Sequence, residues 1–156
     1  MKRTIILAIT HIVALVVGFA LGIYFLPILT AEDAPAEEVL QEAAIGAQYF
    51  GEFVRELPGS DGFHWGEGTI SVTPTQLVHT GELAPGPDYK VYLTQEFVDD
   101  EAGFEAVKDG ALYIGDVKSF DGFLLDLPPG TDIEAYDTVV VWCESFFEFI
   151  TAARYK

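Results

Sequence analysis

The feature that most constrains this chain is an uncharged run near its N-terminus, TIILAITHIVALVVGFALGIYFLPIL, which extends from Thr4 to Leu29. As an α-helix these 26 residues would be roughly 39 Å long, whereas the hydrocarbon core of a bilayer is about 30 Å thick. The run can therefore cross a membrane once, with some tilt. It is also longer than the apolar region of about 7–15 residues that a removable signal peptide usually has.

Two interpretations of this run stay open, an uncleaved signal anchor and a cleaved signal peptide. The small residues Ala-Pro-Ala at 34–36 resemble a cleavage site, but two acidic residues directly precede them. We therefore predict a signal anchor, or transmembrane helix, over residues 1–29. Because Lys2 and Arg3 lie before the run, we expect a cytoplasmic N-terminus in a single-pass cell-membrane protein. The C-terminal domain would then be periplasmic or extracellular.

Gly18 and Gly22 form a G-x-x-x-G spacing inside the apolar run. This spacing lets two transmembrane helices approach closely, and it predicts a weak helix dimer. Glycine is also common in single transmembrane helices, so the alternative is that these two glycines have no partner.

The charge of the chain is concentrated after the apolar run. The first 29 residues contain two basic residues and no acid, so residues 30–156 carry 6 basic and 25 acidic residues, a formal net charge of −19. Such a surface repels nucleic-acid phosphates, and this excludes DNA and RNA as expected partners. The acidic surface either provides solubility or forms a binding face for cations or a basic partner.

Composition and the spacing of apolar residues divide residues 30–156 into a linker and one domain. Residues 30–47 are acidic and rich in Ala, and Glu37–Ala47 within them can form a short helix. From residue 48 the apolar residues recur every second position, as in TISVT, YKVYL and FLLDL, and Pro and Gly separate these runs. Residues 48–156 are therefore predicted to be all-β, an antiparallel β-sandwich or barrel-like domain. Within it, Asp121-Gly122 predicts a two-residue hairpin turn that pairs Phe120 with Phe123.

The stretch TVVVWCESFFEF, from Thr138 to Phe149, is predicted to be one long strand and contains the only cysteine, Cys143. Glu144 and Glu148 share one face of this strand and require water, so Cys143 should point into the core. A single cysteine cannot form an intrachain disulfide. Cys143 is therefore either a buried packing residue or a redox thiol, and a redox thiol normally needs exposure and positive surroundings.

Four segments in this order resemble the DM13 family, from about Gly51 to the C-terminus. They are HWGEGTISV, GPDYKVYL, IGDVKSF and YDTVVVWCESFFEFITAARY, of which the last is the most specific. Two segments depart from the family pattern, Phe123–Asp126 and the long connection Thr94–Gly110. The resemblance implies an extracytoplasmic β-sandwich module that takes part in electron transfer through its cysteine, which corresponds to Cys143.

Other chemistry finds less support in the sequence. A metal or haem at Cys143 would need a second ligand, for which His64 and His79 are the candidates, but no metal-binding spacing is present, and no metal site is predicted. The acidic run Asp99–Glu101 with Asp109 could hold Ca²⁺, but it lacks the EF-hand spacing and indicates a solvated loop instead. No cofactor or substrate can be identified, and enzymatic activity stays open.

Three functions remain as hypotheses. The chain could be an electron-transfer module that uses Cys143 with a redox protein partner. It could be a non-catalytic binding or adhesion module of the cell envelope, in which Cys143 is a buried packing residue. It could also be a structural envelope component whose N-terminal helix provides the main interaction.

Overall fold

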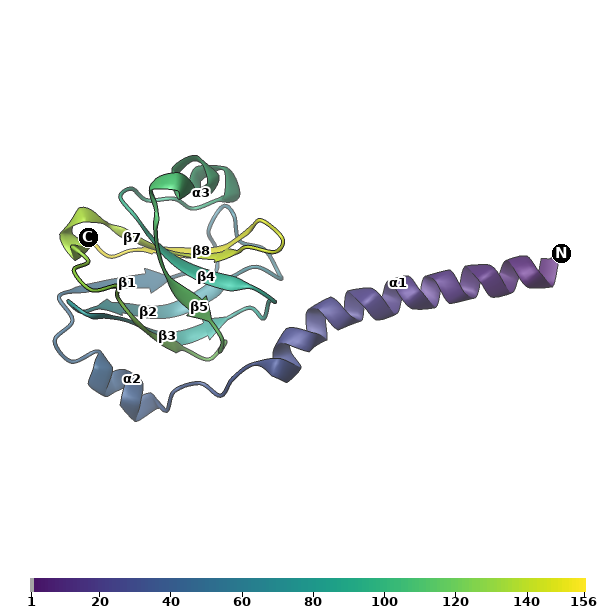
Figure 1. The fold of residues 1–156 in the computed structure, drawn as a ribbon, viewed down its shortest axis with the longest axis horizontal. Helices are drawn as coiled ribbons and strands as arrows, with labels where there is room; N and C mark the ends of the chain where they lie inside the picture. Colours follow the sequence, from purple (N-terminus) through teal and green to yellow (C-terminus); the bar gives the residue numbers. More distant parts are fainter. Residues whose placement is uncertain (1) are drawn as a thin grey trace.

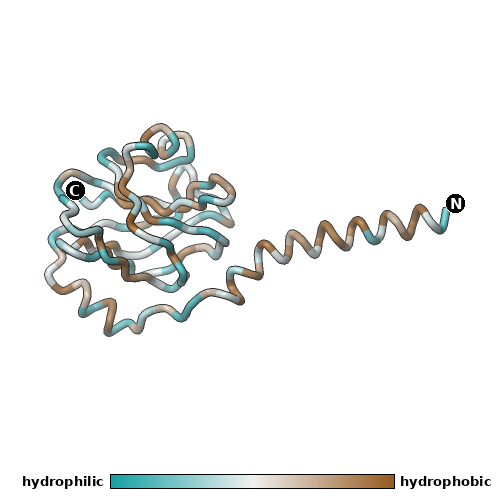
Figure 2. Tube along the Cα trace, viewed as in Figure 1, coloured by the Kyte–Doolittle hydropathy of each residue, from teal (hydrophilic) through white to brown (hydrophobic). Residues whose placement is uncertain are grey.

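A computed structural model describes residues 2–156 as one long N-terminal helix followed by a β domain (Figure 1). Helix α1 (Lys2–Thr30) extends away from the domain and buries only Pro27. Its most apolar 18-residue window has a mean hydropathy of 2.6, and Figure 2 shows its largely hydrophobic course. By length and composition α1 is a candidate membrane span, although a signal sequence at this position would have the same character.

The predicted linker helix is present and shorter than expected. Helix α2 (Glu37–Ala43) begins with Glu37 and Glu38 in its first turn, where negative charge is favourable, and ends four residues before Ala47. Its one buried residue is Leu40, and the helix packs against strands β3 and β6.

The domain contains eight strands in two antiparallel four-stranded sheets. The first sheet has the order β1 (Tyr49–Phe53), β2 (Gly66–Val72), β3 (Gln76–Leu83) and β6 (Phe123–Asp126). The second sheet has the order β5 (Leu112–Val117), β4 (Tyr89–Thr94), β7 (Thr138–Cys143) and β8 (Glu148–Arg154). The all-β, antiparallel sandwich prediction is therefore confirmed. The barrel-like alternative is wrong, because within residues 2–156 no ladder joins the edge of one sheet to the edge of the other.

The main core lies between the two sheets, and the period of two places residues there as predicted. Ile70 and Val72 of β2 are fully buried, as are Val91 and Leu93 of β4. Together with Val141 they belong to one apolar cluster that joins both sheets. Burial of alternate side chains from two facing sheets is the usual way in which a sandwich forms its core.

A second, smaller core covers the outer face of the second sheet. Helix α3 (Glu101–Val107), followed by a 3₁₀ turn at Lys108–Gly110, lies over β4, β7 and β8 (Figure 1). The Phe104 ring of α3 packs on Trp142 at a centroid distance of 4.9 Å, and both side chains are fully buried. Strand β7 is consequently buried on both faces. The long connection Thr94–Gly110 thus provides the helix that covers this second core.

The prediction of one long strand from Thr138 to Phe149 is wrong. Strand β7 ends at Cys143, a turn occupies Glu144–Phe147, and β8 returns antiparallel so that Cys143 pairs with Glu148. Phe147 takes a positive φ of 57° to close this turn. Ser145 and Phe147, which the alternation had placed on the core face, are exposed as a result.

The predicted Asp121-Gly122 hairpin is also wrong. The strands on its two sides belong to different sheets, β5 to the second and β6 to the first. The carbonyl of Phe120 accepts a hydrogen bond from the Leu83 N–H at 2.8 Å, whereas Phe123 pairs with His79. Gly122, at φ 109°, therefore lets the chain cross from one sheet to the other.

Strands β2 and β3 pair two glycines directly with each other, Gly68 and Gly81. A Cβ atom on Gly68 would lie 2.3 Å from the carbonyl oxygen of Thr80, and one on Gly81 would lie 2.1 Å from that of Glu67. Gly68 also has a φ of 116°, which residues with side chains rarely adopt. Both positions therefore require glycine.

Candidate functional site

Cys143 lies at the last position of β7, where the second sheet meets the β7–β8 turn. Its neighbours across the two ladders are Tyr89 on β4 and Glu148 on β8. The side chain is 2% exposed and belongs to the core between the sheets. The inward orientation predicted from the alternation of β7 is therefore confirmed, even though the strand is shorter than predicted.

Cys143 also contributes to the wall of a pocket of about 300 Å³ at the margin of the domain. Tyr89 and His64 line the same pocket, together with Phe146 of the turn and Tyr24 of α1. The cysteine thus lies at the edge of the core, where it shares the wall of this pocket with the turn residue Phe146.

The surroundings of Cys143 favour the thiol over the thiolate. Burial raises the pKa of the Cys143 thiol above its ordinary value, because the charged form loses hydration. The backbone N–H groups of Phe146 and Ser145 act in the opposite direction by hydrogen bonding to the sulfur, but they do not outweigh burial. At rest the group is a protonated, poorly nucleophilic thiol.

The two histidines considered as second ligands lie in different places. His64 lines the Cys143 pocket, and its Nδ1 is 3.2 Å from a carboxylate oxygen of Asp61. His79 is fully buried on β3 between the rings of Phe53 and Phe123, at centroid distances of 5.1 and 4.9 Å. Among residues 2–156 no three His, Cys, Asp or Glu side chains come together in a metal-binding group.

One residue of the acidic run 99–101, Asp100, stabilises the start of a helix. Asp100 is the N-cap of α3, and its carboxylate accepts a hydrogen bond from the Gly103 N–H at 2.7 Å. This cap fixes the beginning of the helix that covers Trp142.

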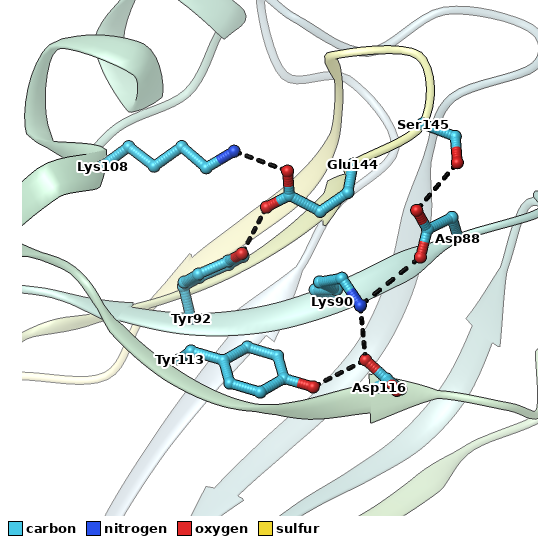
Figure 3. Close-up of polar contacts among 8 residues, drawn as sticks. All are labelled: Asp88, Lys90, Tyr92, Lys108, Tyr113, Asp116, Glu144 and Ser145. Atoms are coloured by element: carbon cyan, nitrogen blue, oxygen red, sulfur yellow. Dashed lines mark hydrogen bonds and ion pairs between the residues drawn. The ribbon is translucent and has the colours of Figure 1, made fainter.

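A polar cluster that the sequence analysis missed surrounds the β7–β8 turn (Figure 3). Glu144, directly after Cys143, accepts hydrogen bonds from Lys108 Nζ at 2.7 Å and from the Tyr92 hydroxyl. Burial acts to raise the pKa of Glu144, but the hydrogen bonds from Lys108 and Tyr92 outweigh burial, so the pKa is lowered and the carboxylate stays charged. The first turn residue is therefore held to α3's 3₁₀ extension and to β4.

The second half of the cluster holds the next turn residue to β4. The Ser145 hydroxyl donates to Asp88 at 2.8 Å, and the Asp88 carbonyl accepts from the Glu144 N–H at 3.0 Å. Lys90 Nζ lies 2.7 Å from Asp116 and 3.4 Å from Asp88, so a chain of charges runs along the face in Figure 3. Ser145 and Asp88, and likewise Lys90 and Asp116, are far apart in sequence, so no local pattern could have identified these contacts.

Taken together, the turn that covers Cys143 is fixed by polar contacts at two consecutive residues, Glu144 and Ser145. Beyond them, Phe146 and Phe147 are 48% and 64% exposed. The arrangement places a protonated thiol beneath a short turn whose attachments are polar and lie near the surface.

Residues 56–155 match the model of the electron transfer DM13 family, which covers well over half of the chain. The match includes both sheets except β1, and it includes Cys143 and all residues of the polar cluster. No curated protein and no solved structure matches the chain significantly. The chain therefore belongs to the DM13 family, and it carries a candidate membrane-spanning helix before its family domain.

Proposed function

We propose that this chain is a membrane-anchored, extracytoplasmic electron-transfer module whose redox group is Cys143. The family description supports a redox-related role, and Cys143 is the only cysteine of the chain. The observation that carries the proposal is the position of Cys143 in the wall of a pocket beneath the β7–β8 turn. A cysteine in the middle of the core would have no comparable route to a partner.

The chemistry that one thiol can perform is thiol–disulfide exchange with a partner disulfide. The Cys143 sulfur loses its proton and attacks one sulfur of the partner, and a new S–S bond forms between them. The partner's S–S bond breaks, and its second sulfur leaves as a thiolate that takes up a proton. Cys143 is oxidised to a mixed disulfide while the leaving sulfur is reduced.

The resting protein suppresses this reaction, because the thiol is buried and its pKa is raised. A partner that competes for the contacts of Glu144 and Ser145 would move the turn and expose the sulfur. In this proposal the polar cluster controls access to the sulfur, and Lys108 holds Glu144 from outside the hairpin.

The alternative is a binding module in which Cys143 is only a packing residue. A specific observation favours it: Cys143 is 2% exposed and is one of the residues that join the two sheets. Free cysteine is often buried as a small apolar group without any chemical role. A weak helix dimer through Gly18 and Gly22 stays a proposal in either case, since a Cβ atom at these positions would have no neighbour within 4 Å.

The two functions differ in how Cys143 reacts with a small aliphatic disulfide such as cystamine. The full chain in mild detergent is incubated with excess cystamine, and the mixed disulfide is measured by intact mass spectrometry at increasing urea concentration. The proposal expects exchange through local opening of the turn, at a rate that is insensitive to low urea. The packing alternative expects exchange only when the whole domain unfolds, at a rate that rises steeply with urea from the start.

A matched pair of variants makes the test specific to the turn. Lys108→Met removes the contact to Glu144, and Lys156→Met removes an equal charge from the ion pair with Glu134. Loss of a partly buried ion pair of about 1 kcal/mol should speed local opening about fivefold in Lys108→Met. Lys156→Met should exchange at the wild-type rate. Equal rates in all three proteins would eliminate the turn as the gate of Cys143.

A further inference from the structure

Three exposed phenylalanines gather at the end of the domain from which α1 departs. Phe63 is 66% exposed, and Phe146 and Phe147 at the tip of the β7–β8 turn are 48% and 64% exposed. Single exposed apolar residues are ordinary, but three exposed aromatic rings at one end of an acidic domain indicate a contact with an apolar partner.

Two of these rings, Phe63 and Phe146, lie beside the C-terminal half of α1. The Phe63 and Tyr24 rings meet edge to face, with centroids 6.2 Å apart. Phe146 shares a groove of about 660 Å³ with Gly22 and Ile23 of the helix. Figure 1 shows the helix leaving the domain on the side where the β7–β8 hairpin has its tip.

The length of α1 places the same residues at a membrane boundary. A helix needs about 20 residues to cross a hydrocarbon core of about 30 Å. Counted from Thr4, the first uncharged residue, these 20 residues end at Ile23, and Tyr24 follows. Tyrosine is enriched at the membrane–water interface. The helix residues that contact Phe63 and Phe146 are therefore those expected at the outer boundary of the hydrocarbon core.

The segment after α1 holds the domain close to this boundary. The Glu32 N–H donates to the carbonyl of Lys118 at 2.9 Å, and the two side chains form an ion pair at 3.2 Å. Only Ala31 separates this attachment from the end of α1 at Thr30. The domain is thus fixed next to the helix end and is not suspended on a free linker.

We propose that Phe63, Phe146 and Phe147 insert into the interfacial layer of the bilayer that α1 spans, so that the domain rests on the outer leaflet. This inference depends on the proposed membrane anchor and extends it to a second, independent contact with the same membrane. The contact is apolar and not electrostatic, since residues 30–156 carry a net charge of −19 that anionic headgroups would repel. It brings the pocket at Cys143 to the level of the lipid headgroups.

The test uses tryptophan as a depth probe in the full chain, reconstituted into phosphatidylcholine vesicles with or without acyl-chain bromine, which quenches tryptophan by contact. Phe147→Trp is the probe. Phe50→Trp is the matched control, because Phe50 is 61% exposed and follows Tyr49, whose ring packs on Tyr155 at the C-terminal end of the chain. Figure 1 shows this end of the sandwich away from α1. Emission of the unsubstituted chain, with Trp65 and Trp142, is subtracted from both variants.

Brominated lipid should quench at least about half of the emission added by Phe147→Trp, as for an interfacial residue, and almost none of that added by Phe50→Trp. Vesicle flotation after an alkaline wash tests the anchor separately. A chain that floats with the vesicles while Phe147→Trp keeps its emission overturns the insertion and leaves the anchor standing. A chain that fails to float overturns both. Cross-linking of two chains through residue 147 without lipid quenching would assign the rings to a second copy of the chain, and the proposal would be wrong.

Discussion

Acidification should destabilise the domain through His79, a histidine that the structure keeps neutral. Burial lowers the pKa of His79 from its ordinary value of 6.5 to about 4, and the hydrogen bond between its Nε2 and the Glu67 carbonyl only partly opposes burial. The other ring nitrogen, Nδ1, has no hydrogen-bond partner among the described residues. A second proton on this ring would therefore place a buried positive charge on the imidazole, with no acceptor for the Nδ1–H group.

The size of this destabilisation follows from the difference between the pKa of His79 in the unfolded chain and in the folded chain. Above pH 6.5 the ring is neutral in the folded and the unfolded chain, and His79 contributes nothing to the pH dependence. Below pH 6.5 the unfolded chain takes up the proton, whereas the folded chain does so only near pH 4. The free energy of unfolding therefore decreases as the pH falls through this window, by about 2 kcal/mol at pH 5 and by about 3 kcal/mol once the pH is below 4.

The perturbation is His79→Phe, which keeps an aromatic ring between Phe53 and Phe123 and cannot titrate. All residues of both cores lie after Glu37, so a fragment beginning there is expected to fold and is suited to urea unfolding. The free energy of unfolding is measured for both proteins at pH 8 and pH 5. The carboxylates titrate alike in the two proteins and cancel in the comparison.

Wild type should lose about 2 kcal/mol more than His79→Phe between pH 8 and pH 5. The variant also loses the hydrogen bond to the Glu67 carbonyl, worth about 1 kcal/mol, and this loss is the same at both pH values. Equal losses in the two proteins would refute the reasoning, because they would mean that the folded state accommodates a protonated His79 as readily as the unfolded chain does.

Two further predictions concern topology and Cys143. A reporter enzyme that is active only outside the cytoplasm, fused after Lys156, should be active, since Lys2 and Arg3 before the helix are expected to keep the N-terminus in the cytoplasm. Activity of a cytoplasm-specific reporter at the same place would contradict this topology. Cys143→Ala should lower the free energy of unfolding by about 1–2 kcal/mol through a small cavity, and Cys143→Ser by about 1–3 kcal/mol through an unpaired hydroxyl. Urea unfolding at pH 8 measures both, and two variants as stable as wild type would contradict the burial of the sulfur.

The sequence predicted those features of the fold that depend on neighbouring residues. The alternation around Ile70 and Val72 identified a half-buried strand, and the faces of β7 identified Cys143 as inward-pointing, because a strand's two faces are decided by its own side chains. The family resemblance located the domain to within a few residues of the matched range. The resemblance also implies a redox role for Cys143, which stays a prediction.

The failures have two physical causes: a turn whose residues give little local signal, and pairing partners that lie far away in the chain. The turn at Glu144–Phe147 contains no Gly, Pro, Asn or Asp, and its two phenylalanines are good strand formers. Its one turn-forming residue is Ser145, which is a weak signal, so the local sequence gave little indication of a reversal. Asp121-Gly122 has the composition of a hairpin turn, yet its two sides pair with different sheets. The contact between Lys108 and Glu144 spans 36 residues and depends on α3 covering the sheet.

The glycine pair between β2 and β3 restricts how this sequence can vary. Where an added side chain collides with another side chain, a second substitution that makes the facing side chain smaller can restore the packing. Here a Cβ atom on Gly68 would collide with the backbone of Thr80, and one on Gly81 with the backbone of Glu67, so no exchange of side chains can relieve either collision. Gly68 and Gly81 should therefore stay invariant in every descendant that keeps this strand pairing, and a random-mutagenesis library selected for folded protein should contain neither single nor paired replacements at the two sites.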